Sequence, residues 1–118
     1  MPRVLLAEDD QTMVGLLTTL LRMDGFQVKA LDADEDIAAA VQQECPDVLL
    51  LDVYLSKQNG LEVLETIRAA DPAHRTRIIM TSGLNVGEES MRRGADGFLL
   101  KPFMPDDLMR MLHKNAPV

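Results

Sequence analysis

Four apolar segments of this sequence are each followed directly by residues that could take part in chemistry. The segments cover residues 4–7, 48–51, 78–80 and 98–100. The residues that follow them are Glu8 and Asp9, Asp52, Thr81, and Lys101. A carboxylate beside a metal cation, a lysine and a hydroxyl group can act as a nucleophile toward a phosphoryl group and form an aspartyl phosphate. These residue types therefore favour phosphoryl transfer, provided that the fold gathers them in one place.

The acidic residues of this set need a positive charge among them. Glu8, Asp9 and Asp52 would repel one another at a shared site, and a bound divalent cation would relieve that repulsion. Oxygen ligands favour a hard ion, and few carboxylates with room for water favour Mg²⁺ over Ca²⁺. His74 and His113 stand outside the set, so zinc is not expected. The sequence thus predicts Mg²⁺ as the cofactor.

Each residue of the set has its own expected role. Asp52 stands alone after its segment and is the expected acceptor, whereas the adjacent Glu8 and Asp9 suit metal binding. Lys101 and Thr81 are expected to bind the oxygens of the phosphoryl group, because such transfer depends on positioning and charge neutralisation. A single acid or lysine at the end of a strand is ordinarily just a solvated residue. Four compatible segment ends are much harder to attribute to chance.

The apolar pattern indicates which elements position these residues. The run at 48–51 is too short for a helix and predicts a strand buried on both faces, and the other three segments repeat that pattern. A weaker strand at 26–31 is expected at the edge of the sheet. The connection with Arg75 and Arg77 is expected to be a solvated loop. Helices are expected over 11–23, after the acids at 34–36, after Gly60, in a short segment at 88–93 and from Pro105 onward.

Five strands that alternate with five helices require parallel pairing and right-handed crossovers. The expected fold is therefore a three-layer, doubly wound α/β domain. Ligands of such sheets bind at the carboxyl ends of the strands, so the polar residues should converge there with Asp52 near the middle.

Length and composition are those of one globular domain over residues 1–118. The net charge of −7 argues against non-specific binding to a nucleic acid backbone. The single cysteine, Cys45, cannot form an internal disulfide and is expected to be a small buried residue near the start of a strand. The sequence shows neither a secretory leader nor an apolar run near the roughly 20 residues of a membrane span, so a cytoplasmic protein is expected.

The order and spacing of these motifs resemble those of response regulator receiver domains, the phosphoacceptor modules of two-component signalling. The resemblance covers essentially the whole chain. Its motifs are Arg3-Val4-Leu5-Leu6-Ala7-Glu8-Asp9-Asp10, Pro46-Asp47-Val48-Leu49-Leu50-Leu51-Asp52, Asn59-Gly60, Thr81-Ser82, Gly94-Ala95 and Lys101-Pro102-Phe103. It implies a flavodoxin-like fold with a five-stranded parallel sheet of order 2-1-3-4-5, five helices, and no output domain within residues 1–118.

The resemblance also implies roles for particular residues. Asp52 accepts a phosphoryl group from a histidine kinase or a histidine phosphotransfer protein. The implied Mg²⁺ ligands are Glu8, Asp9, Asp52 and the backbone carbonyl of Tyr54. Thr81 and Phe98 are implied to act as a switch that reshapes the face of the fourth helix, fifth strand and fifth helix, although Phe98 could equally be a core residue. The Lys101-Pro102 bond is implied to be cis.

By the same resemblance, the chain is a signalling domain and not an enzyme, apart from self-phosphorylation from phosphodonors and self-dephosphorylation. Its expected partners are the kinase or phosphotransfer protein, a downstream effector or a fused output domain, and a second copy in a phosphorylation-dependent homodimer. Direct binding to nucleic acid or to a membrane is not expected.

Three features depart from the usual receiver pattern. Ser56 stands where a proline is common. The interval between Thr81 and Lys101 is shorter than in typical members. Tyr54 and Gly83 occupy positions that tune self-dephosphorylation, so the lifetime of the phosphorylated state is open.

Three rival interpretations stay open at this point. A flavodoxin-like cofactor binder would share the architecture, but it needs a loop rich in glycine or hydroxyl groups where this chain has three acids. A haloacid-dehalogenase-type phosphatase would need a second acid two residues after the nucleophile, where this chain has Tyr54. A receiver that binds partners without phosphorylation is the strongest rival, although such proteins usually lose the acceptor, the acidic pair or the lysine.

Overall fold

A computed structural model describes residues 2–73 and 75–114 of the chain. The strands are β1 (Arg3–Ala7), β2 (Gln27–Ala30), β3 (Val48–Asp52), β4 (Arg77–Ser82) and β5 (Gly97–Leu100). The helices are α1 (Gln11–Met23), α2 (Ile37–Glu44), α3 (Gly60–Ala70), α4 (Gly87–Arg92) and α5 (Pro105–Lys114). None of these helices has the length and apolar character that crossing a membrane requires.

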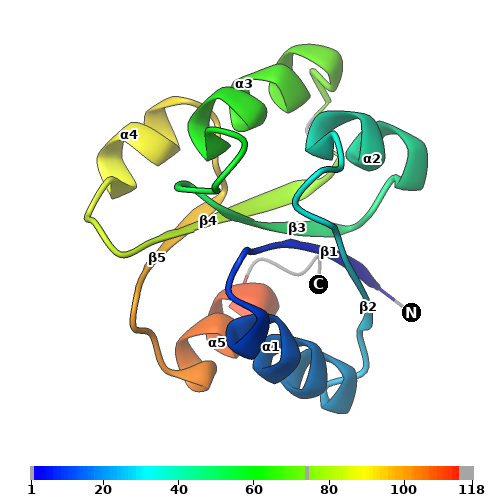
Figure 1. The fold of residues 1–118 in the computed structure, drawn as a ribbon, viewed down its shortest axis with the longest axis vertical. Helices are drawn as coiled ribbons and strands as arrows, with labels where there is room; N and C mark the ends of the chain where they lie inside the picture. The colour runs from blue at the N-terminus through cyan, green and yellow to red at the C-terminus, as the bar shows by residue number, and fades with distance from the viewer. Residues whose placement is uncertain (1, 74, 115–118) are drawn as a thin grey trace.

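The strands form one parallel sheet in the order β2-β1-β3-β4-β5. Helices α1 and α5 cover one face of the sheet, and α2, α3 and α4 cover the other (Figure 1). This arrangement confirms the predicted three-layer, doubly wound fold and its strand order. The weak strand β2 lies at the edge of the sheet, as its sequence pattern predicts.

Strand β3 is buried along its whole length because both of its faces are covered. Leu49 and Leu51 belong to the apolar core that α2 and α3 complete, whereas Val48 and Leu50 belong to the core that α1 and α5 complete. A strand between two helical layers needs apolar side chains on both sides, which explains the continuous apolar run. The apolar run ends at the carboxyl end of the strand with Asp52, which is buried as well.

Side-chain caps fix the starts of the three helices that follow β1, β2 and β3. Asp10 precedes α1, Asp36 precedes α2 and Asn59 precedes α3, and each side chain accepts hydrogen bonds from backbone N–H groups of the first turn. Helix α4 spans only six residues, and Val86 before it supplies no such bond. The expectation of a short fourth helix is confirmed.

The expectation for Cys45 is wrong, and the expectation for the connection before β4 holds only in part. Cys45 is exposed and not buried, because it ends α2 in a left-handed conformation with φ of 47°. The connection before β4 is not simply a solvated loop, since Thr76 is buried and the Arg77 side chain is half-buried. Arg77 Nη2 donates to the carbonyl oxygens of Met111 at 3.3 Å and Leu112 at 3.1 Å, near the end of α5.

Candidate functional site

The register of the strands brings the polar strand ends to one level of the sheet. Glu8 follows the last paired residue of β1 and is level with Asp52 at the end of β3. Asp52 lies beside Thr81 of β4. Lys101 follows β5 directly, and its backbone N–H donates to the carbonyl of Ser82 at 2.7 Å. The fold thus brings together residues that are 93 positions apart in the chain.

Lys101 supplies a positive charge between two of the acids. Its Nζ atom lies 2.5 Å from Glu8 Oε1 and 2.9 Å from Asp52 Oδ2. Glu8 and Asp52 are each only 8% exposed, so water screens this cluster poorly. The peptide bond between Lys101 and Pro102 is cis, as the resemblance implies.

Burial and the neighbouring charges shift the protonation of this cluster. Burial raises the pKa of Glu8 above its ordinary value of 4.5, the hydrogen bond from Lys101 opposes the shift, and the nearby Asp52 carboxylate adds to it. Burial alone would lower the pKa of Lys101, but its bonds to Glu8 and Asp52 outweigh burial and raise that pKa above 10.5. Lys101 therefore stays charged at neutral pH.

The carboxylate of Asp9 has a different partner. The backbone N–H of Ser56 donates to Asp9 Oδ2 at 2.5 Å, across 47 positions of sequence. Ser56 lies in the loop between β3 and α3, so this bond joins that loop to the residue that follows Glu8. Asp9 is thus placed beside the acidic cluster by the fold, while its side chain is engaged by the loop.

The donor groups of this region are those that a hard divalent cation prefers. Glu8, Asp9 and Asp52 offer carboxylate oxygens, and Tyr54 N–H donates to Asp52 Oδ1 at 3.2 Å, which holds the Tyr54 backbone against the acceptor. Within residues 2–73 and 75–114, however, no three His, Cys, Asp or Glu side chains are grouped closely enough to hold a metal ion. The donor types therefore fit Mg²⁺, and coordination by all three acids requires the Asp9 carboxylate to move closer to the other two.

The described histidine lies away from these acids. His113 Nε2 is 2.7 Å from Asp24 Oδ2, which joins the end of α5 to the end of α1. The other histidine, His74, lies outside the described residues.

Phe98 lies half-buried on β5, next to the start of α4. An added Cβ at Gly87, the first residue of α4, would come within 3.1 Å of the Phe98 ring. Phe98 also packs against the core on the α2 and α3 side of the sheet. The ring therefore bears on both the core and the short fourth helix.

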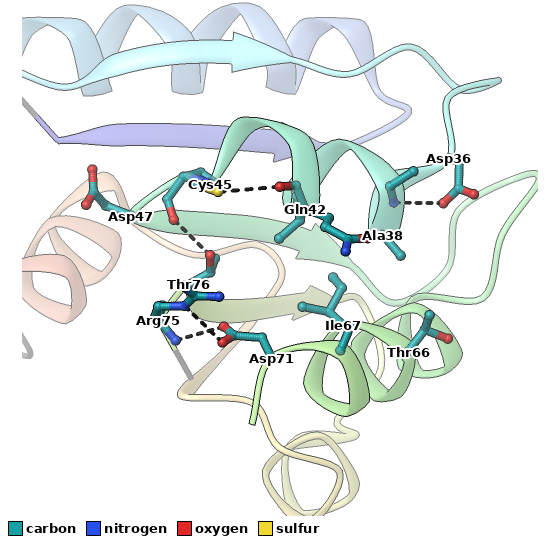
Figure 2. A pocket seen from close by; sticks show the side chains of 14 residues that line it. Asp36, Ala38, Gln42, Cys45, Asp47, Thr66, Ile67, Asp71, Arg75 and Thr76 are labelled. Atoms are coloured by element: carbon teal, nitrogen blue, oxygen red, sulfur yellow. Dashed lines mark hydrogen bonds and ion pairs between the residues drawn. The ribbon is translucent and has the colours of Figure 1, made fainter. Parts of the chain in front are cut away.

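A hollow of about 530 Å³ lies elsewhere, between α2 and α3 (Figure 2). Ile67 of α3 forms part of its apolar wall, and Asp71 and Arg75, which form an ion pair, are on its rim. None of the polar residues at the strand ends lines it. We therefore place the candidate site at the carboxyl edge of the sheet and not in this hollow. The charged groups that converge at that edge are stronger evidence of a functional site than the presence of a hollow.

Comparison with known proteins identifies the family of this chain. The family model described as "Response regulator receiver domain" matches residues 4–113. The chain belongs to the response regulator receiver family. Receiver domains are signalling domains of two-component systems, so the resemblance in sequence motifs is confirmed at the level of family and fold.

Several relatives share most of the receiver domain. The transcriptional regulatory protein CpxR of Klebsiella pneumoniae is 36% identical over 114 residues, which are 92% of this chain and 47% of the relative. The phosphate regulon transcriptional regulatory protein PhoB of Rhizobium meliloti is 32% identical, with 99% of this chain and 55% of the relative covered. The chain thus spans about half the length of these curated relatives.

Solved structures support the same fold. A CheY-like receiver domain from Methanospirillum hungatei superposes with a TM-score of 0.85 at 28% identity, covering 97% of this chain and 92% of that chain. The chemotaxis protein CheY4 of Vibrio cholerae superposes with a TM-score of 0.84 at 27% identity, covering 98% of this chain and 99% of that chain.

The sequence did not reveal the part that Ser56 plays in this receiver domain. Its contribution is a backbone N–H group, which every residue except proline carries, so no residue type marks it. The absence of a proline at this position is the only available signal, and it becomes meaningful only when the position of Asp9 is known.

Proposed function

We propose that this receiver domain accepts a phosphoryl group on Asp52 with the help of Mg²⁺. The donor is a histidine kinase or a histidine phosphotransfer protein in the cytoplasm. The observation that carries the proposal is the convergence of the Asp52 carboxylate with Lys101 and Glu8 at the carboxyl edge of the sheet. A buried carboxylate beside a permanent positive charge is placed to attack an electrophilic phosphorus.

In the transfer, one carboxylate oxygen of Asp52 forms a bond to phosphorus while the bond from phosphorus to the donor's imidazole nitrogen breaks. Lys101 stays protonated and stabilises the negative charge on the phosphoryl oxygens, and the hydroxyl of Thr81, which pairs with Asp52 across the sheet, binds another of them. The protein's contribution is thus positioning and charge neutralisation.

The ligands for Mg²⁺ in this proposal are Glu8, Asp9, Asp52 and the backbone carbonyl of Tyr54. When bound, Mg²⁺ would add positive charge at the phosphoryl oxygens. Without the metal, Lys101 offsets part of the negative charge of Glu8 and Asp52 and bonds to both, which favours their lying side by side.

The proposed output is a change of the face formed by α4, β5 and α5, with Thr81 and Phe98 as the switch. The position of Phe98 between the core and the start of α4 supports this role. Elements of this face carry exposed apolar side chains, namely Leu84 before α4, Met91, Leu100 and Met104. The proposed partners at this face are an effector protein, a fused output domain like those implied by the longer relatives, or a second phosphorylated copy.

Intact mass spectrometry after incubation with acetyl phosphate tests the acceptor. We expect a gain of one phosphoryl group that requires Mg²⁺, is lost in alkali, and is abolished in Asp52→Asn. Asp47→Asn is the matched control, because Asp47 lies just before the opposite end of the same strand and binds Arg3 N at 2.7 Å. Labelling of Asp52→Asn at the wild-type level would reject Asp52 as the acceptor. No adduct in the wild-type protein would favour a partner-binding receiver that works without phosphorylation.

A further inference from the structure

Three successive residues of the loop between β3 and α3 are tied to the loops after β1 and β2. Ser56 N–H donates to Asp9 Oδ2 at 2.5 Å. Lys57 Nζ forms an ion pair with Asp34, and Gln58 Nε2 donates to the carbonyl of Glu35 at 2.7 Å. Of these contacts, the part-buried bond from Gln58 does most to hold the loop beside Asp9, because the ion pair of Lys57 is exposed and contributes little.

The contact with Ser56 separates Asp9 from the other two acids. Glu8 and Asp52 both bind Lys101, whereas the Asp9 carboxylate binds the loop. The described part of the chain correspondingly has no three acidic side chains grouped closely enough for a metal ion. A cation that uses all three acids must therefore draw the Asp9 carboxylate toward the other two while the Ser56 N–H group holds its Oδ2 atom.

We propose that the Ser56 amide is a positioning group that holds the Asp9 carboxylate away from the Glu8 and Asp52 pair and thereby lowers the affinity for Mg²⁺. Binding of the ion then breaks or lengthens the Ser56–Asp9 bond and releases the loop from the β1 side of the site. This inference rests on the proposed function to the extent that Asp9 is a ligand of Mg²⁺.

The size of the effect follows from the type of bond. A hydrogen bond to an ionised carboxylate is stronger than one between neutral groups. Ser56 is exposed and Asp9 is half-buried, so solvent weakens the bond relative to a fully buried one. We therefore expect the Ser56 amide to reduce Mg²⁺ affinity by about tenfold. This corresponds to the lower end of the range of free energies that hydrogen bonds to charged groups contribute.

Two substitutions at the same position separate the backbone amide from the side chain. Ser56→Pro removes the N–H donor, and Ser56→Ala removes only the hydroxyl and keeps the donor. Each protein is titrated with MgCl₂ at constant ionic strength and followed by ¹H–¹⁵N NMR spectra, which also report whether the fold is intact. We expect Ser56→Pro to bind Mg²⁺ about tenfold more tightly than Ser56→Ala and wild type, which should agree within about twofold. Equal or weaker binding by Ser56→Pro would overturn the inference.

The wild-type protein offers a second readout that does not depend on a variant. An amide proton bonded to a carboxylate resonates downfield, so the Ser56 amide signal should move upfield on addition of Mg²⁺. The midpoint of that movement should equal the midpoint of metal binding seen at Asp52 and Tyr54. A Ser56 signal that stays in place while the site fills with Mg²⁺ would reject the proposed competition, even if Ser56→Pro failed to fold.

The same titrations distinguish this inference from the proposed function. If wild type binds Mg²⁺ and is phosphorylated, but Ser56→Pro and Ser56→Ala bind the ion equally, only the role of the Ser56 amide is wrong. If none of the three proteins binds Mg²⁺, both the inference and the proposed use of the metal are wrong.

Discussion

Lys101 lies between two acids that would otherwise repel each other. Its Nζ atom is within 2.9 Å of both Glu8 and Asp52, so one charge compensates two partly desolvated carboxylates. Buried charges are tolerated in proteins when they are paired in this way. Phosphorylation of Asp52 would add negative charge beside the same ammonium group. Lys101 would therefore pair with the two carboxylates before transfer and stabilise the phosphoryl group after it.

Replacement of Glu8 by glutamine tests this charge balance. The pKa of Glu8 is raised by burial, so the folded state binds its proton more tightly than the unfolded state does. Its contribution to stability is therefore fully present below the ordinary value of 4.5 and is lost as pH rises through the raised pKa. We expect Glu8→Gln to be more stable than wild type at pH 7, and expect that gain to vanish below the ordinary glutamate pKa.

Urea unfolding at several pH values measures this difference. Glu88→Gln is the matched control, since Glu88 is exposed and its substitution should give no such pH-dependent gain. A Glu8→Gln protein that is less stable than wild type at pH 7 would mean that the bond to Lys101 outweighs the burial of the charge.

At the scale of residues, the sequence predicted which groups would meet but not how they would pair. Polar residues at the ends of buried strands must share one edge of a parallel sheet, so Glu8, Asp52, Thr81 and Lys101 could be assigned to a single site. Which oxygen each donor reaches depends on rotamers and loop conformation, and residue types do not encode these. The bond between Ser56 and Asp9 lay beyond prediction for that reason.

At the scale of elements, one buried arginine joins three segments of the chain. Arg68 of α3 donates to the carbonyl of Gly94 at 2.8 Å, to the carbonyl of Thr76 at 2.8 Å and to Asp96 Oδ2 at 2.5 Å. Asp96 Oδ2 also accepts from Ile78 N–H at 2.8 Å. Helix α3 is therefore fixed to the start of β4 and to the turn between α4 and β5.

Substitution of Arg68 should loosen this junction. Arg68→Ala leaves two carbonyl groups and the Asp96 carboxylate without their charged donor, and we expect a loss of about 3 kcal/mol in the free energy of unfolding. Arg68→Lys keeps a charge but cannot reach three acceptors at once, so its loss should be smaller but clear. Chemical denaturation measures both, with the exposed Arg22→Ala expected to lie within about 0.5 kcal/mol of wild type. If Arg68→Ala also lay within about 0.5 kcal/mol of wild type, the assigned role of Arg68 would be contradicted.

The elements themselves were largely predictable because local signals and burial agree. Asp10, Asp36 and Asn59 can cap a helix and stand directly before an apolar stripe, and Gly25 and Gly94 follow helices in the left-handed conformation. The burial of Arg68 was not predictable, because an arginine on a helix is ordinarily exposed. Its three acceptors come from parts of the chain up to 28 positions away and meet only in the folded protein.

At the scale of the whole molecule, strands β4 and β5 connect the site with the proposed output face, because β4 carries Thr81 and pairs with β5. Thr81 lies beside Asp52 at the carboxyl end of β4, and Phe98 lies on β5 next to Met80. The Phe98 ring meets the first residue of α4, which is the shortest helix of the described chain and has no side-chain cap. A small displacement at Thr81 thus has a short route to a six-residue helix whose start has no side-chain cap.

Methyl NMR on the methionines tests whether a signal follows this route. Met91 on α4, Met104 before α5 and Met23 at the end of α1 are all exposed, so they differ chiefly in position. With beryllofluoride and Mg²⁺ as a mimic of the phosphoryl group, we expect the methyl signals of Met91 and Met104 to shift and that of Met23 to stay in place. Thr81→Ala should still bind the mimic at Asp52 but lose most of both shifts, because the hydroxyl that links the acceptor to β4 is gone. Undiminished shifts in Thr81→Ala would mean that the change reaches α4 by another route, such as the loop released from Asp9, and would reject Thr81 as the switch.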